Sequence, residues 1–421
     1  MRGLRPVAFP RVLPMRERAE VIHRVIRERL ATVLPVAMRE AGIDMWLILC
    51  QEDNLDPVFT TLIPLNTWCP ILQMLVFHDT GDKFEGLNLS GTNTLDLYER
   101  PVATQLPEVQ WPKLIELIEA RDPQRIGLNI GATQWAAGGL THNLYRQLTE
   151  RLPAKYVERL VSAEAAATRW LATLTESDLA IHEHVVAVGR ALIAECYSPT
   201  ALVPGVTTST DLEWHYWQRA ADLGLEVAFK PYFSVVRRQP ERERLGPEDR
   251  TIRAGDLVHC DVGIKYLRLN SDHQQWAYVL RPGESQAPDG MRRLLAEANR
   301  LQDLFLSEFG EGLTGNELLA NILARARQEG IPSPKVYSHS LGYFLHEPGP
   351  LIGLPWEQER CVGRGDVVLR PNHAFTMELC VRAPVPEWDG QEVTFSIEED
   401  VVFTEQGCRV IQDRQTEFHL I

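Results

Sequence analysis

Residues 260–273 read CDVGIKYLRLNSDH and place two aspartates, Asp261 and Asp272, inside a segment patterned like a strand. The valine, isoleucine, tyrosine and leucine residues favour extended backbone, and a short polar turn near Lys265 to Arg268 predicts a hairpin. Such a hairpin would set the two aspartates opposite each other. Like charges directly opposed in a sheet repel each other. Partly buried carboxylates are unfavourable unless a cation or a hydrogen-bond donor lies beside them. Either the pair therefore faces solvent, or a cation lies between its members.

Further charged residues interrupt strand-like sequence after this segment. SHSLGYFLHEPG (338–349) supplies His339 and His346, FTMELC (375–380) contains Glu378, and SIEEDVVFT (396–404) contains Glu398. Taken singly, each is better explained as a surface, capping or structural residue. Taken together, one shared site explains four carboxylates and a histidine more economically than separate burial penalties do. Such ligands suit manganese, iron, cobalt or zinc, and four carboxylates can hold two divalent ions.

Length and composition limit the possible classes of protein. A chain of 421 residues predicts two domains. A net charge of -14 at pH 7 argues against nucleic-acid binding. The seven cysteines are scattered, which is typical of a reduced protein. No run approaches the ~18 apolar residues that cross a bilayer. We therefore expect a cytoplasmic protein that binds neither nucleic acid nor a membrane.

The chain divides into two regions of different character. Residues 1–165 alternate helical and strand-like segments, among them the apolar strand MWLILC (45–50), which predicts a small α/β domain. Residues 166–421 group their helices and antiparallel strands in blocks, which predicts an α+β domain. Within it, one long helix is expected over residues 167–197, and a capped helix is expected to end at Gly330.

The order of motifs resembles the pita-bread metallopeptidases, the family of aminopeptidase P, prolidase, methionine aminopeptidase and creatinase. The matching motifs are DVG, the second aspartate, SHSLGYFLHE, FTME and IEEDVV. The resemblance implies a C-terminal pita-bread catalytic domain over residues 166–421 and a smaller N-terminal creatinase-like α/β domain over residues 1–165. By position, it implies five metal ligands, which are Asp261, Asp272, His339, Glu378 and Glu398.

The resemblance also implies a mechanism. Two divalent ions per chain, manganese first with cobalt, zinc or iron as alternatives, would be bridged by Asp272 and Glu398. A water between the ions would attack the peptide bond, and Glu378 would carry its proton to the leaving nitrogen. His346 would steady the tetrahedral intermediate or the leaving group. Two-domain members of the family further imply a homodimer.

Departures from the family pattern affect residues outside the ligand set. Arg244 and Lys335 stand where aminopeptidase P and prolidase usually have histidines, and Ser396 stands where an arginine is frequent. HQQW follows the second aspartate in place of ITRT. Fixed positive charge from Arg244 and Lys335 would attract a substrate carboxylate.

Three functions remain open from the sequence. The first is a dinuclear peptidase that cleaves short peptides in the manner of an X-Pro dipeptidase or aminopeptidase, with a carboxypeptidase-like enzyme that recognises a free C-terminus as its variant. The second is a non-catalytic binding module on the same fold. The third is a creatinase-like amidinohydrolase that needs no metal. The complete ligand set favours the peptidase.

Overall fold

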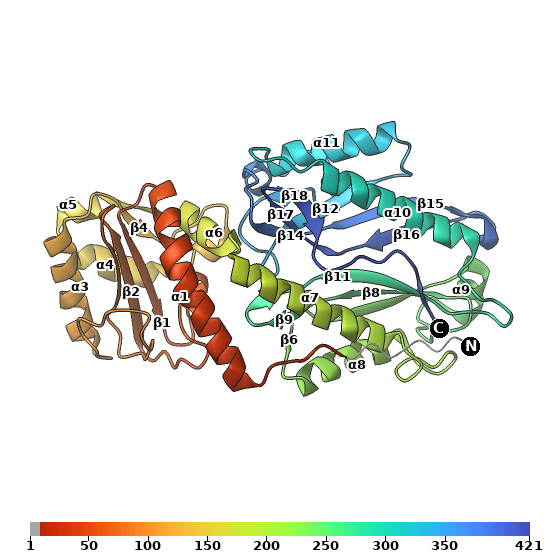
Figure 1. Cartoon of the computed structure of the whole chain (residues 1–421), viewed down its shortest axis with the longest axis horizontal. Coiled ribbons are helices and arrows are strands. Elements are labelled where there is room, and N and C mark those ends of the chain that lie inside the picture. The colour runs from red at the N-terminus through yellow and green to blue at the C-terminus, as the bar shows by residue number, and fades with distance from the viewer. Residues whose placement is uncertain (1–8) are drawn as a thin grey trace. The chain divides into compact units, whose positions relative to one another are not determined.

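The structure is a computed structural model that describes residues 9–421, and these residues form two compact units (Figure 1). The N-terminal unit comprises residues 13–177 with 347–349, and the C-terminal unit comprises residues 9–12, 178–346 and 350–421. The first eight residues of the predicted N-terminal domain lie outside the described range. The boundary after residue 165 stays a prediction.

The N-terminal unit is built on a five-stranded sheet in the order β3-β2-β1-β4-β5. Strands β1, β4 and β5 run parallel, and β2 and β3 are antiparallel to their neighbours. Its elements are α1 (Met15–Glu40), β1 (Met45–Gln51), α2 (Pro57–Thr61), β2 (Leu72–Asp79), β3 (Phe84–Asn88), α3 (Pro107–Arg121), β4 (Ile126–Leu128), η1 (Trp135–Ala137), α4 (His142–Arg151), α5 (Ala154–Val157), β5 (Leu160–Ser162) and α6 (Glu164–Ala172).

The apolar run MWLILC forms the central strand β1, and all six of its residues are buried. A strand with neighbours on both edges and packing on both faces has no solvated side, so it reads as a continuous apolar segment. The α/β prediction for this region is confirmed.

The C-terminal unit contains a seven-stranded sheet, in which β13 branches from the path β16-β15-β12-β14-β17-β18, together with a four-stranded sheet β19-β11-β8-β7 and a small sheet β10-β9-β6. Its strands are β6 (Glu226–Val227), β7 (Tyr232–Val236), β8 (Leu257–Val262), β9 (Ile264–Tyr266), β10 (Leu269–Asn270), β11 (His273–Tyr278), β12 (Lys335–Leu341), β13 (Leu351–Ile352), β14 (His373–Thr376), β15 (Glu378–Val385), β16 (Gln391–Ile397), β17 (Asp400–Thr404), β18 (Gly407–Val410) and β19 (His419–Leu420).

The helices of this unit include α10 and α11, which pack with the seven-stranded sheet around one apolar core (Figure 1). The helices are α7 (Glu176–Cys196), α8 (Ser209–Asp222), α9 (Gln239–Leu245), α10 (Asp289–Ser307), α11 (Gly315–Gln328), η2 (Arg364–Asp366) and η3 (Pro386–Trp388). The predicted cap of α11 is present, since Thr314 and Glu317 form a capping box. The α+β prediction is confirmed.

The prediction of one long helix over residues 167–197 is wrong. Helix α6 ends at Ala172 and α7 begins at Glu176, so residues 173–175 separate two helices. The physical reason is visible in the sequence. Thr175 followed by Asp178 is a helix-start pattern, and a start pattern inside an apparent helix indicates a second helix.

The hairpin at residues 260–273 forms, but the two aspartates are not directly opposed. Residues Leu267 and Arg268 make the turn with positive φ, and the register pairs Asp261 with Gln274. Asp272 lies two positions before Gln274, so the aspartates are diagonal neighbours on one face. The turn lies within the predicted range of Lys265 to Arg268, but it is a two-residue turn at the end of that range, and this register shifts the partner of Asp261 from Asp272 to Gln274.

Gly263 lies between β8 and β9, where the two arms of the hairpin approach each other so closely that only glycine fits. A Cβ added to Gly263 would lie 2.2 Å from the carbonyl oxygen of Ser271. No larger residue fits there without moving the strand that carries Asp272.

A single backbone bridge links the four-stranded sheet to the segment between β16 and β17. Gln274 and Glu398 exchange two N–H···O bonds of 3.1 Å each. A candidate ligand, Glu398, is therefore fixed by its own main chain to the strand that follows Asp272.

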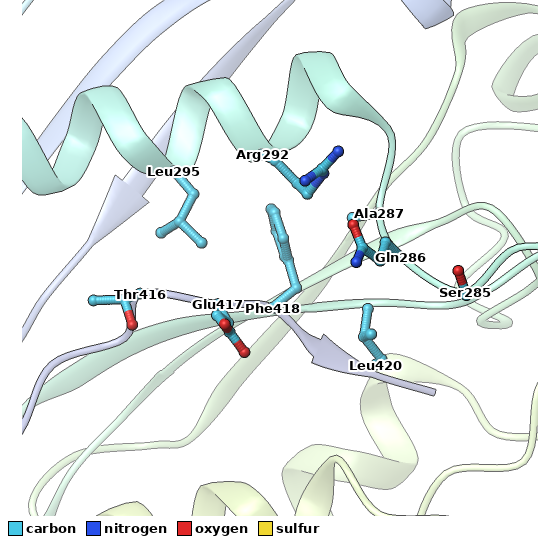
Figure 2. A pocket seen from close by; sticks show the side chains of 9 residues that line it. All are labelled: Ser285, Gln286, Ala287, Arg292, Leu295, Thr416, Glu417, Phe418 and Leu420. Carbon is cyan, nitrogen blue, oxygen red and sulfur yellow. The ribbon is translucent and has the colours of Figure 1, made fainter. Parts of the chain in front are cut away.

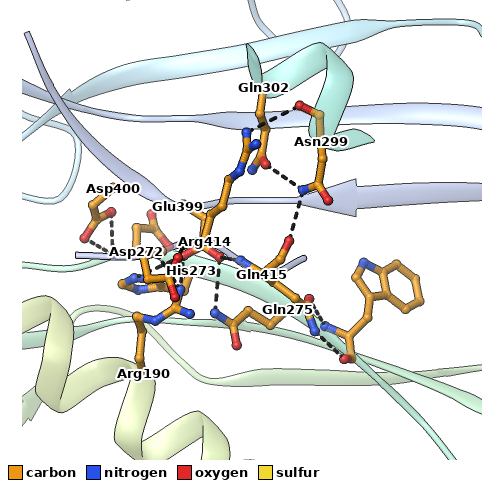
Figure 3. A network of polar contacts seen from close by, with 12 residues as sticks. Arg190, Asp272, His273, Gln275, Asn299, Gln302, Glu399, Asp400, Arg414 and Gln415 are labelled. Atoms are coloured by element: carbon orange, nitrogen blue, oxygen red, sulfur yellow. Dashed lines mark hydrogen bonds and ion pairs between the residues drawn. The ribbon is translucent and has the colours of Figure 1, made fainter. Parts of the chain in front are cut away.

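An ion pair between a partly exposed arginine and a buried glutamate anchors the residue next to Glu398 (Figure 3). Arg190 on α7 donates to the carboxylate of Glu399 at 2.7 Å, and the backbone N–H of Gln415 donates to the same carboxylate at 2.7 Å. Gln275 adds a longer bond of 3.3 Å. Glu399 is fully buried, so these donors replace its lost hydration.

The described residues contain no helix long and apolar enough to cross a membrane. The seven cysteines all fall within the described range, and each is free.

Replacing Arg190 by methionine should lower the free energy of unfolding by ~3 kcal/mol or more, because Glu399 then stays buried without its cation. Urea denaturation measures the change. Arg409→Met is the matched control, since Arg409 pairs with Glu183 at an exposed site. The control should lose no more than ~1 kcal/mol. Equal losses in the two variants would contradict the anchoring role of Arg190.

Candidate metal centre

Three side chains from distant parts of the sequence meet inside the C-terminal unit. Asp272 precedes β11, His339 lies on β12, and Glu398 lies between β16 and β17. One ligand atom from each lies within 4.8 Å of the other two, and all three residues are buried. The Nε2 atom of His339 lies 3.8 Å from Oδ2 of Asp272. These spacings suit a common cation better than direct hydrogen bonds.

The imidazole of His339 is oriented by its own main chain. Its Nδ1 atom lies 3.1 Å from the carbonyl oxygen of Ser340, a bond in which only the nitrogen can donate. A proton on Nδ1 leaves Nε2 with a lone pair directed toward Asp272. Metal-binding histidines are commonly held in this way. Burial lowers the pKa of His339 to about 3, which also favours the neutral ligand form.

Two carboxylate oxygens of the cluster have no hydrogen-bond donor within the described part of the chain. These buried atoms are Oδ1 of Asp272 and Oε1 of Glu398. Burial first, and then repulsion from neighbouring carboxylates, raises the pKa of Asp272 and of Glu398 well above the usual range. Buried anions of this kind call for a cation, so the residues fit a divalent ion.

Glu378 and Asp261 lie at the margin of this cluster. Gln274 donates to Glu378 at 2.7 Å, and Asp261 is the sheet partner of Gln274. Burial raises the pKa of Asp261 to about 6 and that of Glu378 to about 8, and the charge of Asp261 contributes to the second shift. All five predicted ligands therefore occupy one electrostatically connected region, with three of them in closest proximity.

His346 lies beside the cluster. The centroids of its ring and the ring of His339 are 4.5 Å apart, and its Nε2 lies 3.4 Å from the hydroxyl of Tyr337. Burial lowers the pKa of His346, and the charge of Arg364 lowers it further. An exposed imidazole next to the candidate ligand His339 is suited to proton transfer or hydrogen bonding to substrate.

The two basic residues predicted to hold substrate lie in different surroundings. Lys335 is exposed at the start of β12, and alternation along the strand puts it on the same face as Tyr337 and His339. Its Nζ lies 3.4 Å from the carbonyl oxygen of Pro355. Arg244 is an exposed residue of the short helix α9.

Sequence reasoning missed two residues of the site. Gln274 belongs to HQQW, and its position two residues after the candidate ligand Asp272 in extended sequence places both side chains on one face. Arg364 lies in η2, and its charge acts on His339 and His346. No spacing pattern in the sequence points to it.

A cavity of about 390 Å³ elsewhere in this unit is not the candidate site. It lies between the start of α10 and the C-terminal segment, where Arg292, Leu295 and Phe418 line it (Figure 2). None of the predicted site residues lines it. The candidate site is therefore identified by the residue types that meet there and not by the volume of a cavity.

Solved structures with the same fold span nearly the whole chain. An X-Pro aminopeptidase from Thermotoga maritima MSB8 is 17% identical with a TM-score of 0.66, over 92% of this chain and 100% of that chain. A Xaa-Pro dipeptidase from Bacillus anthracis is 17% identical with a TM-score of 0.60, over 95% and 100%. The N-terminal domain of the FACT complex subunit SPT16 from Cicer arietinum is 9% identical with a TM-score of 0.60, over 94% and 98%.

At these identities the likeness establishes the fold, and no curated protein matches the chain by sequence. The sequence profile of metallopeptidase family M24 matches residues 180–405, which is more than half of the chain. The match contains every one of the five predicted ligands and His346. The two-domain layout, the pita-bread fold of the C-terminal unit and the matched profile together show that this chain belongs to metallopeptidase family M24.

Proposed function

We propose that this protein is a metal-dependent peptidase that hydrolyses short peptides. Its site is of the X-Pro dipeptidase and aminopeptidase P kind, with different residues at positions expected to contact the substrate. The observation that carries the proposal is the buried cluster of Asp272, His339 and Glu398, in which two carboxylate oxygens have no hydrogen-bond donor among the described residues. A cluster of this composition is costly unless it holds a cation.

The residues that would hold the ions are Asp272, His339 and Glu398, with Glu378 and Asp261 at the margin. Family members typically bind divalent metals. Two ions, manganese first, remain the expectation from the family resemblance. Bound divalent ions would supply Lewis acidity and lower the pKa of water.

Glu378 is the candidate proton carrier. Its pKa is raised by burial, and its contact with Gln274 leaves it close to the ligand cluster rather than within the tightest part of it. A carboxylate so placed can take a proton from the attacking water and return it to the leaving nitrogen. His346 would donate a hydrogen bond to the substrate as negative charge develops on it.

Lys335 adds fixed positive charge where the family pattern has a histidine, whereas Ser396 stands where an arginine is frequent. Lys335 shares the site-facing side of β12, and Arg364 acts on both histidines. Arginine can hold a carboxylate through two parallel bonds. A carboxypeptidase-like or dipeptidase-like preference for a free C-terminus is therefore the leading variant of the proposal.

A non-catalytic role on the same fold is the second candidate, and the likeness to a FACT complex subunit is the observation that favours it. Elemental analysis of the purified protein separates the two candidates. Bound divalent metal together with peptide hydrolysis supports the peptidase, and metal-free, inactive protein supports the binding module.

Asp272→Ala or Glu398→Ala should abolish both metal binding and peptidase activity, because each substitution removes an anion from the centre of the cluster. Elemental analysis and peptide hydrolysis measure the two losses. Glu405→Ala, at an exposed position in the same unit, should change neither. More than about a tenth of wild-type activity in a metal-supplied Asp272→Ala protein would contradict the assignment.

His346→Ala should lower turnover ~10²-fold or more while metal content stays unchanged, since an imidazole outside the ligand set contributes to the transition state alone. Tyr337→Phe removes only the hydroxyl near His346 and should have a smaller effect. Metal loss in His346→Ala would show instead that His346 is a ligand.

Amidating the C-terminus of a good short substrate should cut kcat/KM by ~10-fold or more, the scale of a charge-assisted hydrogen bond of ~1.5 to 3 kcal/mol. Replacing the basic side chain that binds the C-terminal carboxylate of the substrate should remove the difference in kcat/KM between free and amidated peptides. Lys335→Met, Arg364→Met and Arg244→Met compare the three candidates under matched conditions. Equal cleavage of free and amidated peptides by the wild type would favour aminopeptidase P-like action.

A further inference from the structure

His259 shares the face of β8 that carries Asp261. It lies two residues before Asp261, so alternation along the strand puts both side chains on one side of the sheet. Its neighbours across the sheet are Ser234 on β7 and Trp276 on β11. Trp276 is buried, whereas His259 and Ser234 are partly exposed, and β7 is an edge strand. This face therefore opens to solvent toward β7, and His259 lies on its open part.

The amide of Gln274 determines which nitrogen of His259 carries the proton. Nε2 of Gln274 lies 2.7 Å from Oε1 of Glu378 and 2.9 Å from Oε2 of Glu398, and its two hydrogens serve both oxygens. The amide oxygen of Gln274 is thereby turned to Nε2 of His259, at 3.1 Å. The reversed amide would set its oxygen against two carboxylates. Because an amide oxygen only accepts, Nε2 of His259 is the donor.

The other ring nitrogen of His259 is left as an acceptor. A neutral imidazole has one N–H group and one lone pair, so a proton on Nε2 leaves the lone pair on Nδ1. No donor within residues 9–421 bonds to Nδ1 of His259, and this atom is not sealed inside the protein. A ligand that lies over this face can therefore donate a hydrogen bond to it.

Packing holds the imidazole ring in place. The centroids of the His259 and Trp276 rings are 4.6 Å apart, and Trp276 stacks on Phe395 with ring centroids also 4.6 Å apart. The indole nitrogen of Trp276 donates to the carbonyl oxygen of Ser396. A ring that is already fixed loses little conformational entropy when a ligand binds, so a hydrogen bond to it contributes more to affinity.

The amine of a peptide is a suitable donor for this position. An ammonium group carries three donors and no acceptor, whereas a carboxylate or a carbonyl group has no hydrogen to offer Nδ1. Asp261, on the same face, favours positive charge on the group that binds here.

We propose that His259 is a specificity residue, whose Nδ1 accepts a hydrogen bond from the free N-terminal amine of a short peptide substrate. The inference rests on the proposed peptidase function, because it names a group of the substrate that the same site recognises.

The test compares two substrates that differ only in this amine. One is a good short peptide, and the other is its analogue in which hydrogen replaces the N-terminal amino group. His259→Gln keeps an amide N–H that can reach Gln274 and removes the acceptor at Nδ1. In the metal-loaded full chain it should lower kcat/KM for the free-amine peptide ~10-fold or more, mainly by raising KM, because ground state and transition state lose the same bond. For the analogue, wild type and His259→Gln should differ less than about two-fold, since the bond is absent in both.

His419→Gln is the matched control. Nε2 of His419 lies 3.0 Å from Oε1 of Gln275, which is the same kind of pair at the next residue of β11 and hence on the opposite face of the sheet. This control should change kcat/KM for neither substrate. His259→Phe keeps the stacked ring and removes both nitrogens, so it serves where His259→Gln fails to fold and should behave like it. Elemental analysis should find the same metal content in all these proteins.

The outcomes separate this inference from the proposed function. Equal cleavage of the two substrates by wild type, equal losses on both in a folded His259→Gln or His259→Phe protein, no loss on the free-amine peptide, or loss of bound metal would each overturn the role of His259. The peptidase proposal would stand in all these cases. Wild-type protein that hydrolyses no short peptide with Mn²⁺, Co²⁺, Zn²⁺ or Fe²⁺ would overturn both.

Discussion

The reciprocal backbone bridge between Gln274 and Glu398 is the constraint on which the site depends. It ties the aspartate strands to the segment that follows β16, and so it fixes carboxylates separated by more than a hundred residues in sequence. Arg190 and Gln415 hold the adjacent Glu399 from the other side. These contacts are made by main chain and by a buried acid that pairs with an arginine.

The electrostatics of the site follow from that assembly. Burial raises the pKa of all four carboxylates, repulsion from neighbouring carboxylates raises the pKa of Asp272, Glu378 and Glu398 further, and a neutral imidazole adds no charge to offset them. Gln274 relieves part of the repulsion by donating two hydrogens to two glutamates. A protein amide thus compensates part of the same group of anions that a cation would compensate.

The sequence predicted the fold class, the central strand β1 and the region that contains the ligands, because apolar patterning and motif order are local properties. It located the hairpin turn within residues 265–268 but opposed Asp261 to Asp272, whereas the structure pairs Asp261 with Gln274, since register depends on which residues accept positive φ. It merged α6 with α7 although Thr175 marked the break. Arg364 could not be foreseen, because only the folded chain brings its charge to His346. The ligand roles themselves remain predictions.

Gly263 shows that the spacing of the candidate ligands also depends on a residue that is not itself a candidate ligand. A side chain at this position would collide with the carbonyl oxygen of Ser271, one residue before Asp272, and the two strands would have to separate. A related chain could therefore keep all five acidic and imidazole positions and still lose the spacing between them. Comparisons that score only metal-binding residues would count such a chain as intact, whereas the glycine that sets the interstrand distance would reveal that it is not.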